Sequence, residues 1–254
     1  MLSSILIIIA STGAALLFLV AVTRIWPHHD RKESNDFTGA VVAVIGTTYA
    51  VILAFTLSGV WNNFQEAQAN EEQEANALTN VYRIATTLQD PAAQRIQELC
   101  ARYADNAVNR EWPDMKNDQM PAAADEITDQ LWQLAGQTQA HATPDAIAAY
   151  QLMEELRGLT QYRRLRIMQA RERLPVLLWA VLIAGGIITV AAACFFGVSN
   201  FRFHLLQVLV LSFLISLVLF AIADIDRPYQ GLVIVAPNGF ESVAQKLQRR
   251  DMTK

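Results

Sequence analysis

Residues 39–61 read GAVVAVIGTTYAVILAFTLSGVW, and residues 62–88 continue as NNFQEAQANEEQEANALTNVYRIATTL. The first part is apolar and long enough to cross a bilayer, for which about 20 residues are needed. The second part is polar and contains neither proline nor glycine, so nothing in it should end a helix. We therefore expect one helix from Asp36 to about Leu88, beginning as a membrane span and continuing into water. The rest of the chain is organised around it.

The composition of the 254-residue chain is that of a membrane protein with an added polar domain. Hydrophobic residues make up 53% and charged residues 17%, and the mean hydropathy is +0.22. No basic, aromatic-rich segment indicates nucleic-acid binding. Cys100 and Cys194 fall in a polar helix and in an apolar stretch, so we expect no disulfide between them.

Four apolar stretches are long enough to cross a membrane. They are Leu2–Val22, Gly39–Trp61, Pro175–Val198 and Phe203–Ala223. The first differs from a cleaved signal peptide, because no Lys or Arg precedes it and it exceeds the usual core of about 7–15 residues. The sequence therefore predicts an all-α protein with four membrane helices.

The basic residues near the span ends predict the orientation. With four spans, the N-terminus, residues 62–174 and the C-terminal tail share one side of the membrane. Seven arginines flank the spans on that side and four basic residues flank them on the other. The seven are Arg157, Arg163, Arg164, Arg166, Arg171, Arg173 and Arg227, and the four are Arg24, Arg31, Lys32 and Arg202. We therefore expect both termini and residues 62–174 to be cytoplasmic.

The domain organisation follows from these boundaries. We expect a first transmembrane hairpin in residues 1–61, a cytoplasmic helical domain inserted at 62–174, a second hairpin at 175–223 and a cytoplasmic tail at 224–254. Within the helical domain, apolar residues recur at helical spacing. One of its helices is expected to stop near Trp112-Pro113, because proline disfavours helix at the residue before it.

Several short motifs are spread along the chain. They are Gly46–Phe55 in the second span, Trp61, Glu74–Leu78 before Tyr82-Arg83, Tyr103, Glu111-Trp112-Pro113, Leu174-Pro175 with Trp179, and Asp226–Gly231. Together they resemble a family of bacterial membrane proteins with a bestrophin-like domain, over nearly the whole chain.

The resemblance implies a bestrophin-like fold in a bacterial inner membrane. Bestrophins are pentameric anion channels with four spans, and their second span lines the pore. By analogy, the partners would be the lipid bilayer, further copies of the chain in a homo-oligomer (a pentamer) and small ions. The Arg227–Gly231 element stands where bestrophins have Asn-Pro-Phe-Gly. No acidic cluster follows Gly231, so the calcium clasp of the calcium-regulated members is not implied.

The second span has one face that can line a pore. At 100° per residue, a single sector collects two hydroxyls, an amide, a glycine and two bulky apolar side chains. These residues are Thr48, Ile52, Phe55, Thr56, Gly59 and Asn63. In an oligomer the hydroxyls can solvate an ion and Ile52 or Phe55 can form a hydrophobic gate. The alternative is that the threonines bond to their own helix and the glycine permits close helix packing.

The same sector continues past the membrane through Glu66, Asn70 and Glu74. A ring of carboxylates at a cytosolic mouth attracts cations and repels anions, which conflicts with the anion selectivity of bestrophins. The alternative is an ordinary solvated acidic face at Glu66, Glu71, Glu72 and Glu74. The charge of the conducted ion therefore stays open.

The arginines of residues 157–173 admit three interpretations. They can snorkel to anionic lipid headgroups as part of the positive-inside signal, pair with the acidic stretch Glu71–Glu74, or attract anions into a vestibule. The plainest is the first.

An inner-boundary motif follows the fourth span. It comprises Asp224, Asp226, Arg227, Pro228 and Gly231. Carboxylates at this depth need partners, so we expect an Asp–Arg pair that caps the span, with a proton or cation site as the alternative.

The sequence gives no sign of catalysis or of a cofactor. His28-His29-Asp30 are three adjacent loop residues that do not easily converge on one metal ion, and no nucleophile motif or phosphate-binding glycine loop is present. The function expected is an ion channel. The alternatives are a non-conducting membrane scaffold or sensor whose cytosolic helices recruit a partner, and a proton-coupled transporter.

Overall fold

The computed structural model describes residues 2–88, 92–119, 124–140 and 146–251 of the chain. All regular secondary structure within these ranges is helical. By contact density the chain divides into two compact units. The first unit comprises residues 1–62 and 173–226, and the second comprises residues 63–172 and 227–254.

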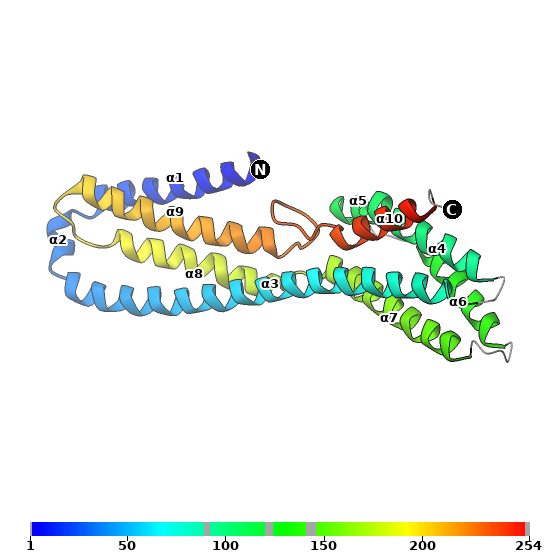
Figure 1. Ribbon diagram of the computed structural model, residues 1–254. Coiled ribbons are helices and arrows are strands. Elements are labelled where there is room, and N and C mark those ends of the chain that lie inside the picture. Colours follow the sequence, from blue (N-terminus) through cyan, green and yellow to red (C-terminus); the bar gives the residue numbers. More distant parts are fainter. Residues whose placement is uncertain (1, 89–91, 120–123, 141–145, 252–254) are drawn as a thin grey trace. The chain divides into compact units, whose positions relative to one another are not determined.

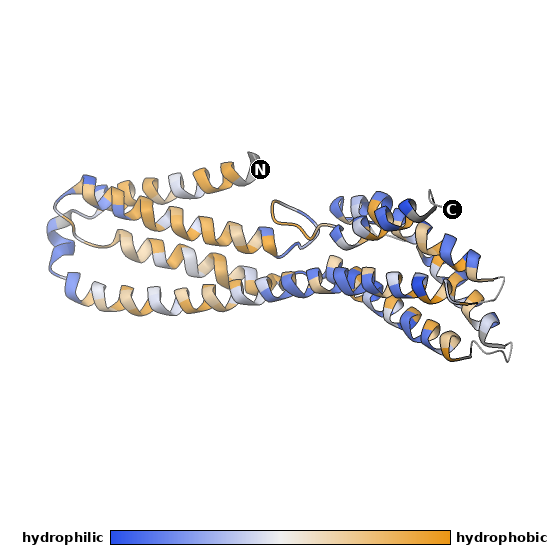
Figure 2. Ribbon diagram, in the orientation of Figure 1, coloured by the Kyte–Doolittle hydropathy of each residue, from blue (hydrophilic) through white to orange (hydrophobic). Residues whose placement is uncertain are grey.

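Helix α3, Asn35–Ala85, is the long helix that the sequence predicts, and it runs through both units (Figure 1). Its 51 residues correspond to a length of roughly 75 Å at 1.5 Å per residue. The helix ends at Ala85 rather than near Leu88. Figure 2 shows its colour changing from mainly orange and white in the first half to mainly blue in the second.

The first unit contains the other long apolar helices, α1 (Leu2–Ile25), α8 (Val176–Cys194) and α9 (Phe201–Ile225). Together with α3, they are the four helices within the described residues that are long and apolar enough to cross a membrane. A short helix, α2 (His28–Lys32), lies between α1 and α3. Helix α1 packs on α9 and α8, and α8 also packs on α9 (Figure 1).

Helix α3 packs closely against α8 within the first unit. Tyr49 lies directly over Gly185 and Gly186, and its hydroxyl donates to the Leu182 carbonyl oxygen at 2.9 Å. A Cβ at Gly185 would lie 2.5 Å from Cδ2 of Tyr49, so the aromatic ring occupies the space that only glycine leaves. Close approach through small residues is typical of membrane helix pairs.

The second unit contains the polar half of α3 with α4 (Ala92–Asn106), α6 (Asp125–Ala140), α7 (Ala146–Arg171) and α10 (Asn238–Asp251). Helix α6 packs on both α4 and α7, and α10 packs on α4. Large side chains that are fully buried here include Ile96, Leu99, Leu131, Leu152 and Leu156. The tail therefore belongs to the same compact unit as the middle segment.

The prediction that a helix stops near Trp112-Pro113 is wrong. After α4 the chain makes a π-helical turn, η1 (Ala107–Glu111), and continues as α5 (Trp112–Lys116). Pro113 is accommodated because it lies in the first turn of α5, where its missing N–H removes no helical hydrogen bond. The wider turn also shifts the register, so that Glu111 and Trp112 are buried while Arg110 stays exposed.

Candidate functional site

The predicted pore face of α3 is partly exposed in the first unit. Thr48, Phe55 and Gly59 are exposed, and the Phe55 side chain is 76% exposed. Ile52 is half-buried at the edge of this face. Thr56 is buried, and its hydroxyl donates to the Ile52 carbonyl oxygen at 2.9 Å. Thr56 therefore fits the packing alternative, whereas the exposed positions Thr48, Phe55 and Gly59 can make contacts outside the protomer.

Further along α3, in the second unit, some residues of the predicted face are exposed and others are buried. Asn63 and Glu66 are exposed. Asn70 is buried and donates from Nδ2 to Oε1 of Gln169 at 3.1 Å. Glu74 is fully buried and ion-paired. The interpretation of Glu74 as a pore-mouth carboxylate is therefore wrong, because its charge faces the interior of the second unit.

Glu74 belongs to a buried group of four ionised side chains, which we call the charge cluster. It consists of Glu74 from α3, Glu111 from η1, and Arg163 and Arg166 from α7. Arg166 donates from Nε and Nη2 to the two oxygens of Glu74 at 2.7 and 2.9 Å. The same Nη2 reaches Oε2 of Glu111 at 2.6 Å. Arg163 Nη2 reaches the other Glu111 oxygen at 2.9 Å, and its Nη1 pairs with the exposed Asp125 at 2.6 Å.

The charges in this cluster balance and hold one another ionised. Burial opposes ionisation of Glu111, but the guanidiniums of Arg166 and Arg163 outweigh it and hold the pKa of that carboxyl below its ordinary value. Burial likewise works against the charge on Arg166, yet Glu74 and Glu111 hold its pKa well above the ordinary value. Glu111 and Arg166 are therefore fixed charges at neutral pH rather than a proton donor or acceptor.

Aromatic side chains enclose the cluster. The Tyr103 hydroxyl donates to Oε1 of Glu74 at 2.6 Å, and burial raises the pKa of Tyr103 well above its ordinary value. The Arg166 guanidinium lies over the Trp112 ring, 4.6 Å from its centroid. Trp112 packs edge-on against Tyr229, and its Nε1 donates to the Val235 carbonyl oxygen at 3.0 Å. These contacts place both the Glu111-Trp112-Pro113 and Arg227–Gly231 motifs around one ion network.

The start of α10 is attached to α3 by a second carboxylate. Oε1 of Glu71 accepts the backbone N–H of Gly239 at 2.8 Å and that of Phe240 at 3.3 Å. An acid at a helix N-terminus satisfies N–H groups that have no partner within the helix. A Cβ at Gly239 would lie 2.8 Å from Cβ of Ala75, so glycine permits this close approach.

The inner-boundary motif is divided between the two units. In the first unit, Asp226 accepts the Leu174 N–H at 3.0 Å, which ties the end of α9 to the start of α8. In the second unit, Arg227 is exposed and Pro228 is buried. Gly231 has a φ of 98°, a left-handed conformation suited to glycine. The structure thus gives Asp226 a backbone partner, while Asp224 is half-buried.

The arginines of residues 157–173 do not share one role. Arg163 and Arg166 are buried in the charge cluster, so the lipid-headgroup interpretation is wrong for these two and the pairing interpretation is right for Arg166 with Glu74. Arg157 is exposed and pairs with Glu154 three residues earlier on α7. Arg164 is also exposed. The sequence contains one signal of this shared burial: Arg163 and Arg166 are three residues apart, which places them on the same face of a helix.

The described part of the chain holds no group of three or more His, Cys, Asp or Glu side chains that could bind a metal ion. His28-His29-Asp30 forms the start of α2, where the His29 imidazole lies 3.5 Å from the Asp30 carboxylate and both side chains are exposed. Cys100 and Cys194 are free and buried, one in each unit.

These features define an all-helical membrane protein with apolar helices in one unit and a buried ion network in the other. A family model for the bestrophin-like domain matches residues 9–240. The chain therefore belongs to the bestrophin-like domain family, which confirms the resemblance seen in the sequence.

Solved structures of low sequence identity share the fold. A mutant of a bacterial bestrophin homologue from Klebsiella pneumoniae is 14% identical, with a TM-score of 0.73 over 97% of this chain and 98% of that chain. Another structure of the Klebsiella homologue gives 14% identity and a TM-score of 0.72, covering 95% and 97% of the two chains. A variant described as a membrane protein gives 14% and 0.73, covering 95% and 97%. No protein with a curated description matches the sequence.

Proposed function

We propose that this protein is a homo-oligomeric ion channel of the inner membrane, with the exposed face of α3 lining the ion path. The observation that carries the proposal is the character of that face. Thr48, Phe55 and Gly59 are exposed in the first unit, and Asn63 and Glu66 continue the sector in the second. Hydroxyl, amide and carboxylate groups beside one large apolar ring are the components from which channel walls and gates are built.

Comparison with α8 supports the choice of α3. The exposed residues of α8 are all apolar, as expected of a helix that faces lipid or an apolar neighbour. On α3, by contrast, exposed polar groups lie within the apolar stretch itself, and polar side chains in a span tend to face the interior of a bundle or a water-filled cavity. An oligomer that turns this face toward its axis provides water or ions for those groups.

Glu66 supports a cation-attracting mouth. It is exposed on α3, and the other two predicted mouth residues are engaged inside the second unit. A ring of Glu66 carboxylates raises the local concentration of cations. We therefore expect Glu66→Gln to lower the preference for cations over anions, measured as the reversal potential in a KCl gradient. An unchanged reversal potential would remove Glu66 from the ion path.

The experiment that tests the channel is ion flux through purified oligomers in liposomes. We expect potassium or chloride flux from the wild type, and a larger flux from Phe55→Ala because the apolar ring that restricts the path is lost. Phe213→Ala is the matched control, since Phe213 is a 48% exposed phenylalanine on α9. Confirmed oligomers without flux in several salts would favour the scaffold function instead.

A further inference from the structure

Arg31, on the short helix α2, is a buried cation in the first unit. Its side chain is 3% exposed. Nη1 donates to the carbonyl oxygens of Cys194 and Phe196, at 2.8 and 3.1 Å. The Cys194 carbonyl is at the end of α8 and the Phe196 carbonyl lies just beyond it, so the guanidinium satisfies acceptors that have no partner within that helix. This anchoring role uses only Nη1, one of the three guanidinium nitrogens.

The rest of the Arg31 guanidinium is poorly satisfied. Among the residues that the structure describes, Nε is buried without a hydrogen-bond partner, and Nη2 has the Thr23 hydroxyl at 3.5 Å as its one acceptor. Among the described side chains no carboxylate forms an ion pair with Arg31, and the nearby acids Asp30 and Glu33 are exposed. A buried charge without an opposite charge is unfavourable. An anion beside Arg31 would offset that charge.

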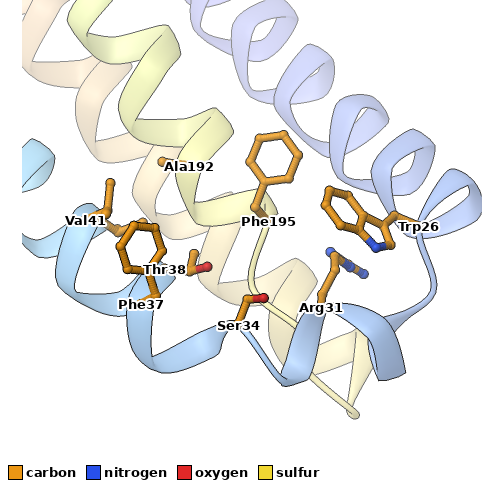
Figure 3. A pocket seen from close by; sticks show the side chains of 9 residues that line it. Trp26, Arg31, Ser34, Phe37, Thr38, Val41, Ala192 and Phe195 are labelled. Carbon is orange, nitrogen blue, oxygen red and sulfur yellow. The ribbon is translucent and has the colours of Figure 1, made fainter.

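A pocket of about 260 Å³ lies beside this guanidinium (Figure 3). Its polar lining consists of Arg31 with the hydroxyl residues Ser34 and Thr38. Its aromatic walls are Trp26, Phe37 and Phe195, and three smaller apolar side chains complete it. Figure 3 shows the Arg31 guanidinium beside the Trp26 ring, with Ser34 and Thr38 on the side toward Phe37. One part of the pocket is thus cationic and hydroxylated, and the rest is apolar.

The pocket also lies where an apolar span gives way to polar chain. Helix α1 ends at Ile25, α3 begins at Asn35 and α8 ends at Cys194, and the pocket is lined by residues next to all three ends. In a membrane this is the level of the lipid phosphates, where aromatic side chains gather. Arginine binds phosphate through several N–H groups at once, and hydroxyls add further donors. The volume is below that of pockets for whole drug-sized ligands, which suits a headgroup fragment.

We infer that this pocket binds the phosphate of an anionic phospholipid, with Arg31, Ser34 and Thr38 holding the phosphate and the aromatic walls holding the adjoining glycerol and acyl methylenes. The bound phosphate supplies the negative charge that Arg31 lacks. This inference is independent of whether the protein conducts ions, because it concerns only the first unit of a single protomer.

The test is lipid binding to the purified, delipidated full-length protein in detergent. Native mass spectrometry and thermal-midpoint titrations would use phosphatidylglycerol, zwitterionic phosphatidylcholine and inorganic phosphate. Phosphatidylcholine carries the same phosphate, but its choline ammonium offsets the negative charge that Arg31 lacks. We therefore expect the wild type to bind phosphatidylglycerol at least tenfold more tightly than phosphatidylcholine, and Arg31→Gln to lose that preference. Lys32→Gln, which removes an exposed charge next to Arg31 and outside the pocket lining, should bind as the wild type does.

A second variant separates lipid binding from the anchoring role of Arg31. Ala192→Phe fills the pocket from α8 without removing the Arg31 side chain, so it should lose the preference even if Arg31→Gln fails to fold. Undiminished phosphatidylglycerol preference in Ala192→Phe would overturn the inference. So would inorganic phosphate that stabilises the protein as strongly as the lipid at equal concentration, since the pocket would then be a site for a free anion.

Discussion

Arg166 and Glu74 form a two-point ion pair, at 2.7 and 2.9 Å, in which both side chains are fully buried. The pair joins α7 to the polar half of α3, and Glu111 extends it to η1. Replacing such a pair by apolar residues can be neutral, but removing one partner leaves an uncompensated charge in a low-dielectric interior. The position of the polar half of α3 within the second unit therefore depends on this contact.

The first prediction concerns that contact. Arg166→Met leaves Glu74 and Glu111 without their shared guanidinium, and we expect a loss of about 3–5 kcal/mol in the free energy of unfolding. Arg157→Met is the control on the same helix, because its pair with Glu154 is exposed and worth only about 0–1 kcal/mol. Denaturant titration of the purified protein measures both. Equal losses would show that the cluster contributes no more than a surface pair.

The second prediction concerns Glu71 and pH. Burial raises the pKa of Glu71 to about 7, against the opposing effect of the Phe240 and Gly239 N–H groups. In the unfolded chain the carboxyl titrates near its ordinary value, so the folded state binds the proton more tightly. The stability that this proton contributes is fully present below the unfolded pKa and is lost as pH rises through about 7.

Glu71→Gln removes this dependence while keeping an oxygen that can accept both N–H groups. We expect the variant to gain stability relative to the wild type between pH 5 and 8 by on the order of 2 kcal/mol. Thermal midpoints across that range measure the difference. Glu66→Gln, at an exposed position of the same helix that does not act on Glu71, should follow the wild type. If the stability of the wild type instead rose relative to that of Glu71→Gln as pH increases, the burial argument would be contradicted.

The third prediction concerns the approach of α3 to α8. Gly185→Ala places a methyl group 2.5 Å from the Tyr49 ring, and we expect it to destabilise the protein by about 1–3 kcal/mol through overpacking. Gly46→Ala is the control, since a Cβ there meets nothing within 4 Å and alanine favours helix. Thermal denaturation in detergent compares the two. A Gly185→Ala protein as stable as Gly46→Ala would show that Tyr49 does not pack on Gly185.

The fold class could be predicted because its signals are local. A span is recognisable from a run of about 20 apolar residues, and α3 from the absence of breakers after Trp61. The same local reasoning failed at Pro113, because a proline ends a helix only when no neighbouring turn accommodates it. The π-helical turn before Pro113 ends at Glu111, which pairs with Arg163 on α7, a contact between residues far apart in sequence.

The candidate site could be predicted only in part, for the same reason. A helical wheel places Thr48, Phe55 and Gly59 on one face, but only tertiary packing decides that Thr56 and Glu74 turn inward. Arg166 and Glu74 are 92 positions apart, so their pairing was one of several interpretations. From the sequence, Arg31 could be recognised only as one of the four basic residues expected on the non-cytoplasmic side of the membrane. Its burial without a carboxylate is a property of the packed helices.

The most direct test of the channel compares two adjacent threonines of α3. Thr47 and Thr48 are both exposed, and their side chains project about 100° apart. Cys100 and Cys194 are fully buried, so an introduced cysteine would be the main target of a thiol reagent. We predict that a charged thiol reagent blocks the planar-bilayer current of Thr48→Cys and leaves that of Thr47→Cys unchanged. Oligomers that carry no current, or block at Thr47→Cys alone, would contradict a pore lined by this face of α3.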